Sequence, residues 1–153
     1  MSISVGDEAP EFTLKATDGS DVTLSSFRGD SSVTLVFYPF AFSGICTSEL
    51  CEIGDNLSAF NDADNVVLAI SCDRHHALRA FKEAEGLDFE LLADGWPHGA
   101  VSRAYGCFDE DLGVALRRTV VVGRDGRIAR IFDSGGIGEA RDLGSYTDAL
   151  GSL

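Results

Sequence analysis

Two cysteines, Cys46 and Cys51, are the residues of this chain best suited to chemistry. They stand five positions apart in VFYPFAFSGICTSELCEIGDNL, a stretch that begins with an apolar run ending at Pro39. The spacing is wrong for the C-x-x-C knuckle of a zinc site, and a separation of five does not put both thiols on one helix face. The alternatives are two small core side chains, the usual role of free cysteines, or two reactive thiols.

The sequence after Cys46 predicts a helix that starts near Thr47. Its apolar stripe runs through Leu50, Ile53, Leu57 and Phe60. Cys46 extends this stripe into the opening turn, where the helix dipole and unpaired backbone N–H groups favour a thiolate. Cys51 lies about 100° around the helix from Leu50 and therefore nearer the solvent. We expect one sheltered, activated thiol and one accessible thiol.

The predicted helix restricts how Cys46 and Cys51 can join. Five helical residues rise about 7.5 Å and rotate about 140°, which separates the two Cα atoms by roughly 8 to 9 Å. A disulfide needs Cα atoms within about 7 Å. The pair can close only if the start of the helix unwinds, which suits a transient bridge in a catalytic cycle better than a structural one.

Other patterns predict strands and helices that alternate. We expect, in order, two short strands around an Asp18-Gly19 turn, strands at 32–39 and 65–71, a helix at 75–86 and a strand at 89–94. These are followed by a short helix that opens at Pro97, two strands joined through Asp125-Gly126 within 118–132, and a helix at 144–153. This order predicts an α/β protein with a thioredoxin-like fold, in which helices flank a mixed central sheet extended by an N-terminal β-hairpin. We expect residues 1–153 to form one domain.

The formal net charge of −13 disfavours nucleic acid and anionic membranes as partners. No apolar stretch is long enough to cross a membrane, and the N-terminus lacks the pattern of a secretory signal, so we expect a cytoplasmic protein. Only Lys15 and Lys82 are lysines, against ten arginines. Such an acidic surface reflects either adaptation to high salt or ordinary acidic drift; adaptation predicts that the melting temperature rises steeply with molar KCl.

Pro39, Ser43 and Cys46 reproduce the pattern P-x-x-x-[T/S]-x-x-C, and here the sequence resembles the peroxiredoxins. GDEAPEFTL and RRTVVVGRDGRI extend the resemblance over nearly the whole chain, and two subgroups, alkyl hydroperoxide reductase E and peroxiredoxin Q, are similar. The resemblance implies that Cys46 attacks a hydroperoxide, with Ser43 and the Cys46 N–H as donors and Pro39 shielding the site. It also implies that Arg117 holds the thiolate and that Glu49 orients this arginine, although a first-turn acid that favours the helix dipole is an equal alternative for Glu49.

Several roles stay open within this resemblance. Cys51 matches a resolving cysteine that forms an intrachain disulfide, to be reduced by a thioredoxin- or glutaredoxin-like partner; an external thiol, Cys72 or Cys107 are the alternatives. Arg118 stands where the family commonly has glycine, so Arg118 is an alternative to Arg117 as the arginine that contacts the thiolate. The resemblance further implies a homodimer that meets across the active-site loop.

Two rival functions remain. A thioredoxin-type disulfide oxidoreductase normally has a C-x-x-C and a cis-proline facing the thiol, but the prolines here are Pro10, Pro39 and Pro97. A non-enzymatic redox sensor would be oxidised once at Cys46 and would then stall. We expect no cofactor or metal, because nucleotide motifs are absent and His75-His76 lacks further ligands at suitable spacing.

Overall fold

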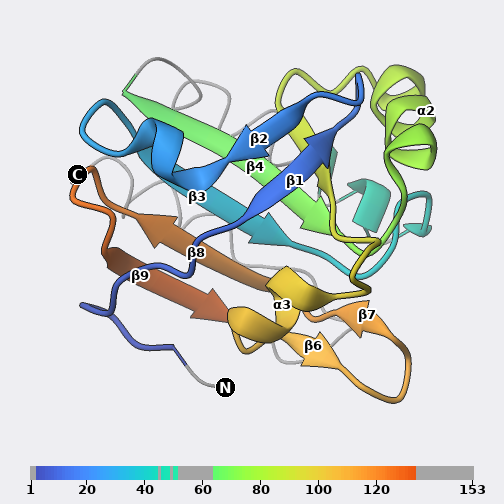
Figure 1. The fold of residues 1–153 in the computed structure, drawn as a ribbon. Helices are drawn as coiled ribbons and strands as arrows, with labels where there is room; N and C mark the ends of the chain where they lie inside the picture. Colours follow the sequence, from blue (N-terminus) through green and yellow to red (C-terminus); the bar gives the residue numbers. More distant parts are fainter. Residues whose placement is uncertain (1–2, 45, 49, 52–63, 134–153) are drawn as a thin grey trace.

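The computed structural model describes residues 3–44, 46–48, 50–51 and 64–133 (Figure 1). Its main feature is a seven-stranded sheet of order β2-β1-β5-β4-β3-β8-β9. The strands are β1 Thr13–Ala16, β2 Asp21–Thr23, β3 Ser32–Phe37, β4 Asn65–Ser71, β5 Glu90–Ala93, β8 Arg118–Val122 and β9 Ile128–Asp133. Figure 1 shows β3 between β4 and β8; it is parallel to β4 and antiparallel to β8, so the predicted mixed sheet is confirmed.

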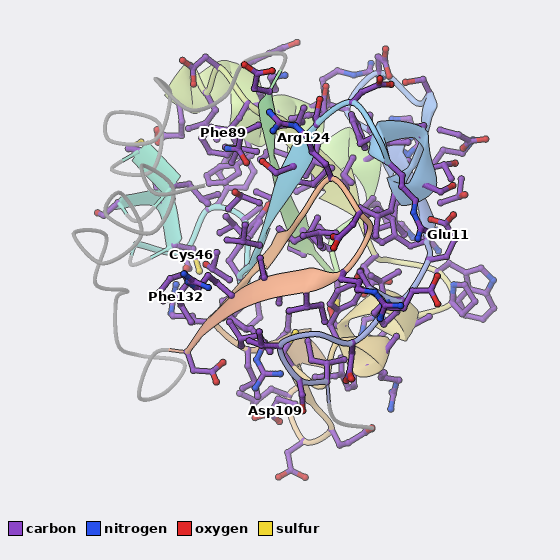
Figure 2. The ribbon with its side chains drawn as sticks, turned by 90° about the vertical axis from the view of Figure 1, so that its left-hand side faces the viewer. Glu11, Cys46, Phe89, Asp109, Arg124 and Phe132 are labelled. Atoms are coloured by element: carbon purple, nitrogen blue, oxygen red, sulfur yellow. The ribbon has the colours of Figure 1, made fainter. Side chains whose placement is uncertain are left out.

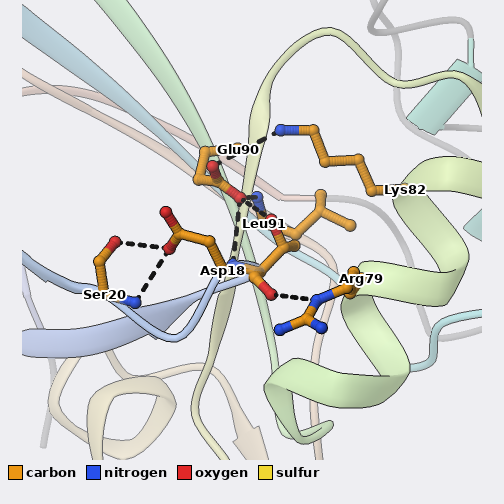
Figure 3. A network of polar contacts seen from close by, with 7 residues as sticks. Asp18, Ser20, Arg79, Lys82, Glu90 and Leu91 are labelled. Atoms are coloured by element: carbon orange, nitrogen blue, oxygen red, sulfur yellow. Dashed lines mark hydrogen bonds and ion pairs between the residues drawn. The ribbon is translucent and has the colours of Figure 1, made fainter.

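The predicted N-terminal hairpin is also confirmed and forms one edge of the sheet. β1 and β2 pair antiparallel around the Asp18-Gly19 turn, and β1 then pairs with β5. Gly19 has φ +85°, a left-handed conformation that glycine adopts without strain. Figure 3 shows how the turn is tied to β5 and to the helix that contains Arg79: Glu90 of β5 accepts a hydrogen bond from Thr17 Oγ1 at 2.8 Å, and Arg79 Nε donates to the Thr17 carbonyl at 2.9 Å.

Helices cover the sheet where the sequence predicts them, with one correction. The helix α2 spans His75–Glu85 and ends at Gly86 in a left-handed cap. The short helix α3, Ala100–Ala104, does not open at Pro97 as predicted. Residues 95–99 form turns instead, because Gly99 has φ +69° and breaks the helical backbone between Pro97 and Ala100.

Three small features complete the described structure. A 3-10 turn, η1, spans Leu24–Phe27, and β6 Phe108–Asp109 pairs with β7 Val114–Ala115 in a separate ribbon. Strands of two residues are too short to produce a recognisable alternation, which is why the sequence did not predict this ribbon. The predicted helix at 144–153 lies outside the described residues.

The sheet separates two apolar cores, because alternate residues of a strand face opposite sides. From β3, Leu35 and Phe37 point into one core, and Val36 into the other. The second core also contains Cys46 and Leu50 together with Leu78 and Phe81 of α2. Nowhere among the described residues is there a helix long and apolar enough to cross a membrane.

Candidate active site

The site begins where β3 leaves the sheet. The Tyr38 N–H donates to the Ile70 carbonyl at 3.1 Å, which continues the pairing with β4 by one residue, and Pro39 is buried. The chain then passes through an exposed loop and is helical at Cys46. Cys46 is 0% exposed and packs in the same core as Leu50, as the predicted stripe requires. The sulfur is therefore shielded from bulk water.

A guanidinium group faces this sulfur. Arg117 Nη2 donates a hydrogen bond to Cys46 Sγ at 3.2 Å, and the Arg117 side chain is itself buried, at 3% exposure. Arg117 directly precedes β8, where Arg118 pairs with Phe37 at the end of β3, so the register brings residue 117 beside the loop. A permanent positive charge at hydrogen-bond distance stabilises a thiolate, and it does so more strongly where water is excluded.

Ser43 accepts hydrogen bonds from the first turn of the helix that contains Cys46. The Cys46 N–H donates to Ser43 Oγ at 3.2 Å, and the Thr47 N–H donates to the Ser43 carbonyl at 2.8 Å. Ser43 Oγ thus satisfies one of the N–H groups that a helix start leaves unpaired. Because its oxygen accepts this bond, its own O–H remains a donor for another group.

The second arginine turns away from the thiol. Arg118 Nε and Nη2 lie 2.7 and 3.1 Å from the two carboxylate oxygens of Asp133, and Nη1 donates to the Tyr105 carbonyl at 2.9 Å. The hydrogen bond with Asp133 raises the pKa of Arg118. Of the two candidate arginines, Arg117 is the one that contacts Cys46.

The structure brings together only part of the predicted site. Cys46, Ser43 and Arg117 are linked by direct contacts, and Cys51 is half-buried at the edge of the same core. Glu49 lies outside the described residues. Figure 2 shows Phe132 near Cys46, and this ring packs against the same core; no pattern in the sequence places it there.

The two other cysteines have a different environment. Burial and the nearby Asp94 carboxylate raise the pKa of Cys72 to about 11. Burial raises the pKa of Cys107 to about 12, and this thiol belongs to the core on the opposite face of the sheet from Cys46. Both groups are therefore protonated at neutral pH and are poor nucleophiles.

One residue that the sequence analysis missed also touches the site. Asp73 accepts a hydrogen bond from the Ala41 N–H, in the loop between Pro39 and Ser43, with a distance of 3.0 Å from nitrogen to Oδ2. The only sequence signal for this contact is the place of Asp73 just after β4, next to the strand that precedes the loop.

A sheet of this topology that holds a buried thiol against a buried guanidinium defines a thiol-based redox protein. The model of the AhpC/TSA family matches residues 5–131. Among curated relatives, alkyl hydroperoxide reductase E of Mycobacterium tuberculosis is 45% identical over 151 residues, covering 99% of this chain and 98% of the relative. Peroxiredoxin Bcp of Escherichia coli is 34% identical over 137 residues, covering 86% of each chain.

Solved structures agree with these relatives. The reduced 2-Cys peroxiredoxin of Plasmodium vivax superposes with a TM-score of 0.85 at 28% identity, covering 96% of this chain and 80% of that one. Peroxidoxin BcpB of Mycobacterium tuberculosis has a TM-score of 0.85 at 27% identity and covers 97% of both chains. The thioredoxin-like fold is thereby confirmed. The chain belongs to the AhpC/TSA family, the peroxiredoxins, and its activity is that of a thiol-dependent peroxidase.

Proposed function

We propose that Cys46 is the peroxidatic cysteine and that it reduces hydrogen peroxide and organic hydroperoxides. Its thiolate attacks one oxygen of ROOH, the S–O bond forms as the O–O bond breaks, and RO⁻ takes up a proton and leaves as ROH. Cys46 is then a sulfenic acid. The single observation that carries this proposal is the 3.2 Å contact between Arg117 Nη2 and Cys46 Sγ inside the protein.

The groups around Cys46 have the chemistry that this transition state needs. Negative charge moves onto the breaking O–O bond, and donors that are positioned before the reaction stabilise it most effectively. Arg117 supplies a charged donor and the Ser43 hydroxyl a neutral one, while the Cys46 N–H, expected as a further donor, is instead used to hold Ser43 Oγ in place. We assign to Pro39 the exclusion of water and to Glu49 the orientation of the arginine.

We further propose that Cys51 resolves the sulfenic acid. The Cys51 thiol attacks the sulfur of Cys46, a disulfide forms, and the hydroxyl leaves as water. Both residues are helical in the thiol state, so the helix start has to unwind before the sulfurs can meet. A thioredoxin- or glutaredoxin-like dithiol then reduces the disulfide, and that dithiol becomes oxidised.

The other thiols are less suited to this step. Cys107 lies in the core across the sheet, and the raised pKa of Cys72 leaves little thiolate at neutral pH. If Cys51 is silent, an external thiol has to resolve Cys46. The rival function, a thioredoxin-type disulfide oxidoreductase, is less favoured, because Arg117 stands where that class has proline.

We also propose that the protein works in the cytoplasm as a homodimer that meets at the active-site loop. Phe40 and Phe42 of this loop are 41% and 56% exposed, which supplies apolar surface for a second copy. Sedimentation equilibrium of the reduced protein would detect the dimer, and Phe40→Asp should shift it toward the monomer. A wild-type protein that stays monomeric at micromolar concentration would contradict the dimer.

Two cysteine variants test the peroxidase mechanism. In stopped-flow assays with hydrogen peroxide and a dithiol reductant, Cys46→Ser should abolish turnover, because the attacking sulfur is gone. Cys51→Ser should complete one oxidation and then stop at the sulfenic acid, which intact-mass analysis detects as one added oxygen. Cys107→Ser is the matched control and should turn over like the wild type. Full activity in Cys46→Ser would refute the mechanism, and normal cycling in Cys51→Ser would refute intrachain resolution.

A further inference from the structure

Asp73 connects the end of β4 to the loop that carries the reactive cysteine. Its Oδ2 accepts two hydrogen bonds, from the Ala41 N–H at 3.0 Å and from Ser71 Oγ at 2.7 Å. Ser71 is the last residue of β4 and is completely buried. The carboxylate is thus fixed to a rigid strand on one side and holds a backbone amide of the loop on the other.

The loop residue next to that amide has a strained backbone. Phe42 has φ +68°, and among the described residues it is the only one other than glycine with positive φ. A bulky side chain in this region persists only where its surroundings hold it, and such residues cluster at active sites and switch regions. Here the ring of Phe42 packs on Phe81 of α2, with 4.9 Å between centroids, and the preceding amide is held by Asp73.

The strained turn determines where the catalytic groups lie. Ser43 directly follows Phe42, and Ser43 Oγ receives the Cys46 N–H at 3.2 Å. Cys46 in turn meets Arg117. A continuous path therefore leads from Asp73 through Ala41, Phe42 and Ser43 to the backbone of Cys46, although Asp73 itself does not touch the reacting atoms.

We propose that Asp73 is a positioning residue for the reaction of Cys46 with peroxide. By holding the Ala41 amide it keeps the strained turn at Phe42 closed and Ser43 in place under Cys46. The same contact opposes the unwinding of the helix start that a Cys46–Cys51 disulfide requires, and this second half rests on the function proposed above. Asp73 thereby sets the balance between fast oxidation and fast resolution.

The hydrogen bond from the Ala41 N–H to Asp73 is strong enough to offset the backbone strain at Phe42. The free energy of a hydrogen bond to a charged acceptor is similar to the free-energy cost of a bulky residue at positive φ. One such contact is therefore enough to keep the turn at Phe42 in place. A purely structural role, in which Asp73 only caps the end of β4 through Ser71, would affect stability and leave both chemical steps unchanged.

Three variants separate these roles. Asp73→Ala removes the acceptor of the Ala41 N–H. Asp73→Asn has a side chain of the same shape that keeps one oxygen acceptor, so it should preserve the conformation of the loop. Asp109→Ala is the matched control, because Asp109, the last residue of β6, likewise accepts two hydrogen bonds at one carboxylate oxygen, from the N–H groups of Asp111 and Leu112. If Asp73→Ala does not fold, Ser71→Ala tests the same chain of contacts by removing the group that fixes the carboxylate.

The experiment follows oxidation of Cys46 and formation of the Cys46–Cys51 disulfide in the reduced full-length chain by stopped-flow and quenched intact-mass analysis. In Asp73→Ala we expect oxidation about tenfold slower, disulfide formation several-fold faster, and less sulfinic acid at high peroxide. Asp73→Asn and Asp109→Ala should stay within about threefold of the wild type. Ser71→Ala should shift both steps in the direction of Asp73→Ala, by a smaller factor.

Several outcomes would overturn the proposal: unchanged rates in Asp73→Ala, rates of both steps that move in the same direction, or an equal response of Asp109→Ala. Failure of the proposed function looks different. If wild-type protein forms no Cys46–Cys51 disulfide, intrachain resolution is wrong, and the rate of Cys46 oxidation in Asp73→Ala still tests the positioning role.

Discussion

Cys46 and Cys72 follow neighbouring parallel strands, β3 and β4, yet they have opposite electrostatic surroundings. The sulfur of Cys46 meets the guanidinium of Arg117 at 3.2 Å. Cys72 lies near the carboxylate of Asp94, and burial together with this negative charge raises its pKa to about 11. A place at the carboxyl edge of the sheet therefore does not by itself make a thiol reactive: at Cys72 burial and the neighbouring negative charge both disfavour the thiolate, whereas the charge that faces Cys46 is positive.

Cys107 adds a second contrast. Arg118 lowers the pKa of this thiol, but burial outweighs the effect, and the pKa is about 12. The guanidinium of Arg118 is engaged by both carboxylate oxygens of Asp133, which cancels much of its positive charge. An arginine in the neighbourhood is therefore not sufficient to make a thiol reactive, because at Cys107 burial outweighs its effect on the pKa.

Removal of the Arg117 guanidinium should have the largest effect, because this group distinguishes the surroundings of Cys46 from those of the other cysteines. Arg117→Met keeps the length of the side chain but loses the charged donor, so the second-order rate constant with hydrogen peroxide should fall about 10²- to 10³-fold. Arg118→Met is the matched control and should lose less than about threefold, because Arg118 does not contact Cys46. Stopped-flow measurements at saturating reductant give both values. Equal losses in the two variants would remove the special role of Arg117.

Loss of the Ser43 hydroxyl should have a smaller effect. Ser43→Ala leaves the Cys46 N–H without its acceptor and removes a neutral donor, so the same rate constant should fall about tenfold. Ser43→Thr keeps the hydroxyl and should retain the activity of the wild type. A Ser43→Ala protein as fast as the wild type would show that the hydroxyl takes no part.

The smallest change should come from the charge beside Cys72. With a pKa of about 11, only about one Cys72 in a thousand is ionised at pH 8, and labelling by iodoacetamide should rise about tenfold with each pH unit up to pH 10. Asp94→Asn removes a negative charge that repels the thiolate, so the pKa of Cys72 should fall and labelling at pH 8 should rise several-fold. Peptide mass spectrometry measures the labelling rate. Slower labelling in Asp94→Asn would contradict the claim that the charge of Asp94 raises the pKa of Cys72.

Most of the fold was predictable because its strands and α2 carry clear patterns. The continuous apolar run of β3, the Asp125-Gly126 turn and the helical spacing in α2 each have a local cause in the sequence. The start of α3 was predicted wrongly, because the left-handed conformation of Gly99 depends on tertiary packing: a Cβ there would lie 2.2 Å from the ring of Phe108.

The site was predictable where a motif covers it. The pattern from Pro39 to Cys46 identified Ser43, whereas the choice between Arg117 and Arg118 needed the structure, because no local pattern records that the residue before β8 contacts Cys46 while the first residue of β8 contacts Asp133. Asp73 and Phe132 come from separate strands or loops, and no spacing in the sequence records that they meet the loop or the core around Cys46.

The most direct test of the account is to locate the first oxygen that the reduced protein accepts. Reduced protein is mixed with less than one equivalent of hydrogen peroxide at pH 7, quenched within seconds in the presence of a sulfenic acid trap, and digested for peptide mass spectrometry. We expect the trapped adduct at Cys46, or the Cys46–Cys51 disulfide in its place, while Cys72 and Cys107 remain unmodified. Comparable oxidation of Cys72 or Cys107 would contradict the claim that the contact with Arg117 selects the reactive thiol.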